Sequence, residues 1–145
     1  LQDVRFIIVR EKSTINKVAE ICLEQLWITS APALIVVCSQ PNHQADWYGE
    51  RGRHVFSTQN AAAAIENALL AATDLGLGTC WVGGYDQEQI DSLFGASGSA
   101  RVEGIITVGY ANENPATKHV NDHLTSIYFE SYGNDKIDLD FIYKY

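Results

Sequence analysis

The sequence predicts one compact domain in which a central β-sheet is covered by helices on both faces. Short apolar segments rich in β-branched residues alternate along the chain with longer segments of helical periodicity. The two segments nearest the start are almost continuously apolar, as strands buried on both faces are. The chain of 145 residues is long enough to bury a real core and falls in the usual size range of one domain.

The first part of the chain is expected to form two strands with a helix between them. The strands lie at Val4–Val9 and Ala33–Cys38, where β-branched residues are concentrated. Ser13 or Thr14 can cap the helix, which is expected to run to about Gln25 with one apolar face. The chain therefore begins with a strand, a helix and a second strand.

Residues 40–54 are polar and irregular, and we expect a surface loop or a short mobile helix there. Trp47 and Tyr48 stand among charged residues in this segment. Their favoured role is ordinary packing, and the alternative is an aromatic lid over a ligand.

Ser57–Leu75 is expected to be a long helix whose polar residues recur every seven positions in one narrow stripe. A helix that is apolar over most of its circumference is buried on most sides. In a domain of this size, that pattern suggests that a second subunit covers part of it. Gly76 is expected to end the helix, because glycine adopts the left-handed conformation there at little cost.

The segment that follows is the most informative one for function. Thr79–Val82 is expected to be a short buried strand, and Gly83 and Gly84 follow at its end. Bare backbone at a strand end lets a flat ligand approach closely, and such ends are common ligand sites. The alternative is a tight turn and a bulge with no ligand, because short glycine motifs are weak signals by themselves.

The remainder is expected to add a helix, a strand and a short tail. Asp86 caps a helix to about Phe94, and Val102–Tyr110 is a third long strand. Leu124–Tyr132 is expected to be a helix or a turn, with a turn at Gly133. Ile137–Phe141 alternates between apolar and acidic residues, as a half-buried strand does.

Composition excludes some classes of function. The net charge of −8 argues against nucleic acid as a partner, since binding a phosphate backbone needs clustered Lys and Arg. No apolar run is long enough to predict a membrane span, and Leu1–Val9 has no signal-peptide pattern. The chain lacks an initial Met, so we expect it to begin inside a longer one. Three cysteines in apolar stretches predict buried free thiols in a reducing cytoplasm: Cys22, Cys38 and Cys80.

Other catalytic patterns are weak. His119 and His123 have the spacing of two metal ligands on a helix, but the Glu of the metalloprotease pattern is missing, so a solvated loop is favoured and no metal is expected. The chain has no nucleophile elbow, no phosphate-binding loop of the P-loop type and no dinucleotide fingerprint. Asp138 and Asp140 share one strand face and are expected to be solvated.

Several segments, taken in their order and spacing, resemble the nitroreductase-like FMN flavoproteins. They lie between residues 31 and 115, and the start of the chain resembles that family's N-x-Q-P-W-x-F segment. The matching segments are Ala31-Pro-Ala-Leu-Ile-Val-Val-Cys38, Tyr48-Gly-Glu-Arg-Gly52, Gln59-Asn-Ala-Ala-Ala-Ala-Ile-Glu-Asn67, Gly76-Leu-Gly-Thr-Cys-Trp-Val-Gly-Gly84 and Val108-Gly-Tyr-Ala111.

The resemblance implies an α+β fold with a central mixed sheet flanked by helices, in an intertwined homodimer with FMN sites at the subunit interface. Residues 1–145 would then be one domain that lacks the family's N-terminal arm, with a tail from about 124 to 145 that crosses to the partner. The implied reaction is ping-pong: NAD(P)H reduces FMN, and a small electrophile such as a nitroaromatic or quinone takes the electrons.

The resemblance also assigns the site residues. Trp81, Val82, Gly83 and Gly84 would lie along the flavin ring, with a backbone N–H near flavin N5, and Gln2 matches the glutamine of the N-terminal motif. Lys118 lies where the family often has a basic residue near the flavin phosphate. Trp47 and Tyr48 lie in the segment that often walls the substrate side.

The sequence also departs from the family pattern. The arginine-rich N-terminal arm is absent, and Asp3 and Val4 replace Pro and Trp. We interpret the chain as part of a longer flavoprotein, because the resemblance begins in the middle of a motif. The alternative is a non-catalytic member of the fold that binds a nucleotide-like ligand or a partner.

Overall fold

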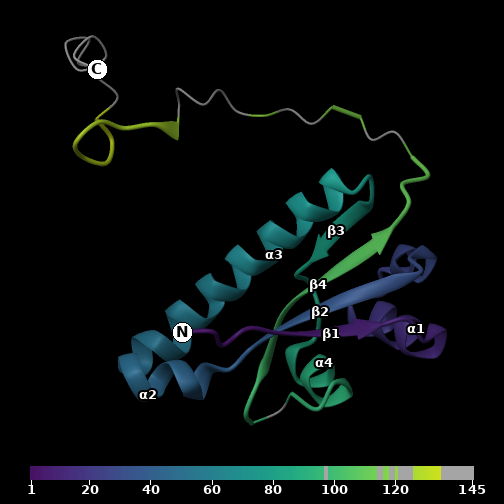
Figure 1. The fold of residues 1–145 in the computed structure, drawn as a ribbon, viewed down its shortest axis with the longest axis horizontal. Coiled ribbons are helices and arrows are strands. Elements are labelled where there is room, and N and C mark those ends of the chain that lie inside the picture. Colours follow the sequence, from purple (N-terminus) through teal and green to yellow (C-terminus); the bar gives the residue numbers. More distant parts are fainter. Residues whose placement is uncertain (97, 114–115, 118–119, 121–125, 135–145) are drawn as a thin grey trace. The chain divides into compact units, whose positions relative to one another are not determined.

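The structure is a computed structural model that describes residues 1–96, 98–113, 116–117, 120 and 126–134. The chain divides into two units, Leu1–Asn112 and Glu113–Tyr145, which are described separately. The first unit holds all the helices and strands that the structure describes. Its elements follow in the order β1, α1, η1, β2, α2, η2, α3, β3, α4 and β4 (Figure 1).

The first unit is built on one four-stranded sheet. Its strands are β1 (Arg5–Val9), β2 (Ala33–Ser39), β3 (Gly78–Val82) and β4 (Arg101–Gly109). They lie in the order β1-β2-β4-β3, and all three described pairings are antiparallel. The long strands β2 and β4 are therefore central, and β1 and β3 are edge strands. The α+β class is confirmed.

Helices cover both faces of this sheet, as the continuous apolar strands predict. On one face, α1 (Lys12–Ile21) and α4 (Gln87–Leu93) bury a core with side chains of all four strands. Helix α3 (Ser57–Asp74) lies along the other face (Figure 1). There Ala61 and Ile65 pack against Val37 and Ile106. Fully burying one such aliphatic side chain stabilises the fold by roughly 1.5–3 kcal/mol.

The first helix differs from the expected one at both ends. Glu11 caps it instead of Ser13 or Thr14, and its carboxylate accepts a hydrogen bond from the Ser13 N–H at 3.4 Å. The helix ends at Ile21 and not near Gln25, because Leu23 and Glu24 adopt left-handed backbone conformations. A 3-10 helix, η1 (Leu26–Ser30), then leads into β2.

Residues 41–56 are helical, so the short-helix alternative is the correct one. Helix α2 (Pro41–Arg51) has non-helical backbone angles at Gly49, and the π-helix η2 (Gly52–Phe56) joins it to α3. The ring of Tyr48 packs edge-on against Phe56 with 5.3 Å between centroids. The packing role predicted for Tyr48 is therefore seen, whereas Trp47 is 70% exposed.

Helix α3 confirms both its predicted bounds and its polar stripe. The stripe residues are exposed or half-buried, and Ser57, Ala61, Ile65 and Ala72 are the buried ones. The sequence predicts that α3 is buried on most sides. In a single chain it is not, because Leu70 of this helix is 61% exposed.

A β-bulge interrupts the pairing of β2 with β4. The register shifts between Val37, which pairs with Gly104, and Cys38, which pairs with Val102. Glu103 is the extra residue, and its carboxylate accepts a hydrogen bond from the Ser39 hydroxyl at 2.7 Å. A bulge re-aims side chains locally, and here it lets Val102 and Ile105 enter the same core.

The second unit is described mainly at residues 126–134, where the chain makes a tight turn. The Phe129 N–H donates to the Asn134 carbonyl oxygen at 2.8 Å, and Gly133 adopts a positive φ of 85°. The turn predicted at Gly133 is therefore present. The predicted strand Ile137–Phe141, including Asp138 and Asp140, lies outside the described residues, as do His119 and His123.

Candidate functional site

The site begins with the turn that ends α3. Gly76 adopts a φ of 73°, and its N–H donates to the Thr73 carbonyl oxygen at 3.0 Å, so the predicted helix stop is confirmed. The Leu77 N–H donates to the Ala72 carbonyl oxygen at 2.9 Å, which completes the left-handed cap. The chain then reverses directly into β3 and delivers Gly83 and Gly84 to the end of that strand.

Strand β3 is less buried than the sequence predicts. Only Val82 is buried among its five residues, while Cys80 and Trp81 are exposed. The prediction that Cys80 is a buried thiol is therefore wrong, whereas Cys22 and Cys38 are buried as expected. The reason is position: among the described strands, β3 lies at the edge of the sheet, with a neighbouring strand on one side only.

The backbone at Gly83 is open. A methyl group built on its Cα would meet no atom within 4 Å, and the same group on Gly84 would make only an ordinary contact, at 3.6 Å from Leu23 Cδ1. In the described part of the chain, the N–H groups of Gly83 and Gly84 enter none of the turn and loop hydrogen bonds. Two backbone donors at a bare strand end can receive a flat ligand with acceptor atoms.

Three contacts hold this open segment in place. The Gln25 side-chain amide donates to the Gly84 carbonyl oxygen at 3.2 Å and to the Cys22 carbonyl oxygen at 2.8 Å. The Asp86 N–H donates to the Ile21 carbonyl oxygen at 3.1 Å. The Tyr85 hydroxyl donates to the Val102 carbonyl oxygen at 3.1 Å. The glycines are therefore exposed but anchored from both sides.

The two titratable residues that follow the glycines, Tyr85 and Asp86, stabilise the local structure. Burial raises the pKa of Tyr85, which keeps its hydroxyl protonated as a donor. Hydrogen bonds from Gln89, chiefly from its backbone N–H, lower the pKa of Asp86, as expected for the carboxylate that caps α4. Tyr85 and Asp86 are thus engaged with Val102 and Gln89 and stabilise the fold beside the glycine pair.

Trp81 lies on the α3 face of the sheet because Gly104 leaves room for it. A methyl group on Gly104 would stand 2.6 Å from Trp81 Nε1 and 2.7 Å from Ile65 Cδ1. Real contacts of that kind are not found below 3.0 Å. The bare Gly104 backbone therefore lets the indole lie across β4, with 41% of Trp81 exposed beside the glycine pair.

The family model for the nitroreductase family matches residues 23–110. The chain belongs to the nitroreductase family. A protein of Archaeoglobus fulgidus, named as a proposed NADH dehydrogenase/NAD(P)H nitroreductase, is 31% identical over 116 residues, which cover 77% of this chain and 63% of that protein. The NADPH-flavin oxidoreductase of Vibrio harveyi is 27% identical over 128 residues, which cover 81% of this chain and 52% of that enzyme.

A solved structure has the same fold. The structure of NfrA2 from B. megaterium has a TM-score of 0.82 and 25% identity over 92% of this chain and 59% of that one. The chain thus spans between half and two thirds of the length of these similar proteins.

The other residues assigned by the nitroreductase resemblance are only partly brought together. Gln2 is exposed just before β1, at the sheet edge opposite β3. Three strand spacings separate these edges, or about 14 Å. Trp47 and Tyr48 lie on α2, and Lys118 is outside the described residues. The compact part of the predicted site is therefore Trp81 to Gly84.

Sequence reasoning missed Gln25 and Gly104. The sequence predicts that Gln25 ends a helix, and no neighbouring residue indicates a hydrogen bond to Gly84, 59 positions away. Gly104 interrupts an apolar strand, which can signal a close approach, but the partner that approaches cannot be read from the strand itself. In the part of the chain that the structure describes, no group of three metal-binding side chains is found and no helix is long and apolar enough to cross a membrane.

Proposed function

We propose that the protein is an FMN-dependent oxidoreductase that uses NAD(P)H to reduce small electrophiles such as nitroaromatics and quinones by a ping-pong mechanism. Membership of the nitroreductase family supports this, as do the names of the relatives. The observation that carries the proposal is the open Gly83–Gly84 backbone at the end of β3.

The residues present fit a flavin. FMN, when bound, accepts hydride from the nicotinamide and passes electrons to the acceptor. Trp81 to Gly84 would hold its ring: the glycines leave space for a planar group, and the two N–H donors would stabilise negative charge on it. Gln25 and Tyr85 fix those donors before the ligand arrives, which lowers the cost of ordering on binding.

Residues outside the segment from Trp81 to Gly84 would complete the proposed site. We propose that Gln2 binds the polar edge of the ring and that Lys118 pairs with the phosphate. We propose that Trp47 and Tyr48 wall the substrate side. The exposure of Trp47 supports this role, because an exposed aromatic side chain can contact a bound substrate.

A second copy of the chain would cover the apolar surface that one copy leaves open. On the α3 face of the sheet, Phe6 and Ile8 of the edge strand β1 are 52% and 61% exposed, and Leu70 of α3 is exposed as well. Exposed apolar side chains of this kind mark interaction surfaces. We propose a homodimer whose tail, about 124–145, crosses to the partner. The free thiols support a cytoplasmic location.

The test is the absorption spectrum of the full chain purified without added flavin. We expect the flavin bands, roughly one FMN per subunit, and loss of the bands when NADH or NADPH is added without oxygen. A colourless protein that also fails to take up added FMN would contradict the proposal and favour a non-catalytic member of the family.

A further inference from the structure

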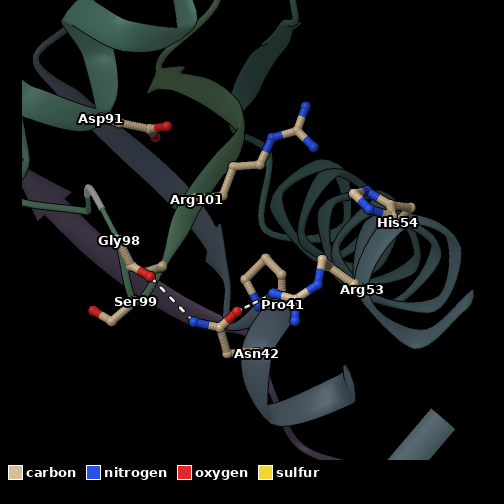
Figure 2. A pocket seen from close by; sticks show the side chains of 9 residues that line it. Pro41, Asn42, Arg53, His54, Asp91, Gly98, Ser99 and Arg101 are labelled. Atoms are coloured by element: carbon tan, nitrogen blue, oxygen red, sulfur yellow. Dashed lines mark hydrogen bonds between the residues drawn. The ribbon is translucent and has the colours of Figure 1, made fainter. Parts of the chain in front are cut away.

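A polar cavity of about 260 Å³, open to solvent, lies at the start of β4, and neither Gly83 nor Gly84 lines it. Its walls come from the start of α2, from η2 and from the loop that joins α4 to β4 (Figure 2). No residue from Trp81 to Gly84 lines it. In a chain with a net charge of −8, the cavity gathers three side chains that carry or can carry positive charge: Arg53, His54 and Arg101.

Arg101 has an unpaired guanidinium as far as the described residues show. Its side chain makes no hydrogen bond or ion pair with the described residues. Asp91, the carboxylate among the described lining residues, is already engaged, because Oδ1 accepts from the Val102 N–H at 2.7 Å and Oδ2 from the Gln87 side-chain amide at 3.0 Å. Asp91 therefore fixes the start of β4 and leaves the Arg101 guanidinium for another anion.

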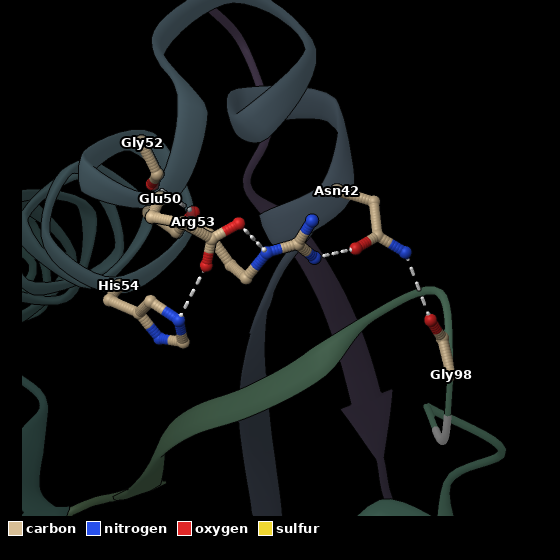
Figure 3. A network of polar contacts seen from close by, with 7 residues as sticks. Asn42, Glu50, Gly52, Arg53, His54 and Gly98 are labelled. Atoms are coloured by element: carbon tan, nitrogen blue, oxygen red, sulfur yellow. Dashed lines mark hydrogen bonds and ion pairs between the residues drawn. The ribbon is translucent and has the colours of Figure 1, made fainter.

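Arg53 is held in place by neighbours that use only part of its guanidinium. Its Nε donates to Glu50 Oε1 at 3.3 Å, and one terminal nitrogen donates to Asn42 Oδ1 (Figure 3). Asn42 in turn donates to the Gly98 carbonyl oxygen at 3.2 Å, which ties the loop to α2. The second terminal nitrogen of Arg53 has no partner among the described residues. Glu50 is 75% exposed, so solvent screens its charge.

We propose that this cavity binds the phosphate group of a small polar molecule, separately from the flavin. Two guanidiniums from different elements, Arg53 of η2 and Arg101 of β4, line this space, and the His54 imidazole lies beside them with its Nε2 3.0 Å from Glu50 Oε2 (Figure 2). Charge-assisted hydrogen bonds from guanidiniums are the strong ones in phosphate recognition. The network through Asn42 orders Arg53 in advance, so less freedom is lost when the anion binds.

The arrangement favours a phosphate over a carboxylate. A carboxylate is planar, and one guanidinium fork satisfies it. A phosphate monoester presents three terminal oxygens in a tetrahedral arrangement and carries nearly two negative charges at neutral pH. Arg53 and Arg101 line the cavity from different elements, η2 and β4, so an anion that contacts both needs oxygens that point in more than one direction, as those of a tetrahedral phosphate do. The volume leaves space for a small group attached to the phosphate.

The test is a titration of the ¹⁵N-labelled full chain with inorganic phosphate at constant ionic strength, with and without FMN. We expect saturable shifts of the Arg53 and Arg101 Nε–Hε signals in both cases. Replacing Arg101 with Gln should raise the Kd at least about tenfold, since a hydrogen bond to a charged group is worth that much. Arg10→Gln, at an exposed residue outside the cavity, changes the net charge equally and should leave the Kd unchanged.

Four results would overturn the proposal. They are the absence of saturable shifts up to about 10 mM phosphate, equal weakening by Arg10→Gln and Arg101→Gln, succinate binding as tightly as phosphate, and shifts that vanish once FMN is bound. The last result would mean that phosphate had occupied the flavin site. The flavin spectrum is recorded in the same samples, so a failure of this site is distinguishable from a failure of the oxidoreductase proposal.

Discussion

Replacing Gly104 with Ala tests whether this glycine positions Trp81 beside the proposed flavin site at Gly83 and Gly84. The new methyl group would stand 2.6 Å from Trp81 Nε1, where ordinary contacts begin at 3.4 Å. The indole would have to retreat by about 0.8 Å, and Ile65 by nearly as much. Ile65 can rotate its end group, but the ring is rigid, so we expect Trp81 to leave its position.

The expected cost is that of overpacking, about 1–3 kcal/mol. For a chain of this size, that loss corresponds to a fall in melting temperature of about 3–9 °C. We also expect weaker binding of FMN, because Trp81 lies beside the glycine pair. Differential scanning calorimetry measures the first effect, and quenching of flavin fluorescence measures the second.

Gly83→Ala is the matched control. A methyl group there meets nothing within 4 Å, and the backbone at Gly83 does not adopt a positive φ. Stability should therefore change by less than about 0.5 kcal/mol, while FMN affinity falls because the methyl group occupies the proposed ring position. The reasoning is refuted if Gly104→Ala melts within about 1 °C of the unmodified chain, or if Gly83→Ala is the less stable of the two.

Four further predictions follow from the same structure. Gly83→Pro removes the N–H donor, so flavin reduction by NAD(P)H should be lost while the circular dichroism spectrum is retained; normal turnover would show that this donor is not used. Gln25→Ala removes two hydrogen bonds and should lower the free energy of unfolding by about 1–2 kcal/mol in urea titrations; no change would mean that the segment needs no such anchor. Burial raises the pKa of Cys22 and Cys38 from 9.0 to about 11, so the unfolded chain loses these protons first and stability should fall between pH 9 and 11; a variant with both cysteines changed to Ala should lose that part of the slope, and an identical slope would contradict the assignment. Deleting residues 134–145 should weaken the proposed homodimer in analytical ultracentrifugation, and an unchanged dimer mass would count against a tail that crosses to the partner.

Much of the fold could be predicted because its signals are local. Gly76 ends α3 through its own backbone preference, and Asp86 caps α4 through a bond to the Gln89 N–H three residues away. The polar stripe of α3 repeats along one helix. Each of these features depends on residues that are neighbours in sequence, so the sequence is sufficient to place them.

The features that could not be predicted depend on distant partners. Cys80 is exposed because β3 lies at the edge of the sheet, and the residues of a strand do not encode its place in the strand order. The bulge at Glu103 arises from the pairing of β4 with β2. Gln25 donates a hydrogen bond to Gly84, and the two residues lie together because α1 and α4 pack on the same face of the sheet. The sequence therefore predicts the position of Gly83 and Gly84 but not the residues that hold them in place.

The central claim is that a flavin lies against the backbone of Gly83 and Gly84. The most direct measurement is a titration of the ¹⁵N-labelled full chain with FMN, followed through its backbone amide signals. We predict that the Gly83 and Gly84 signals move most and saturate near one FMN per chain. Saturable binding that leaves both signals in place would contradict the claim.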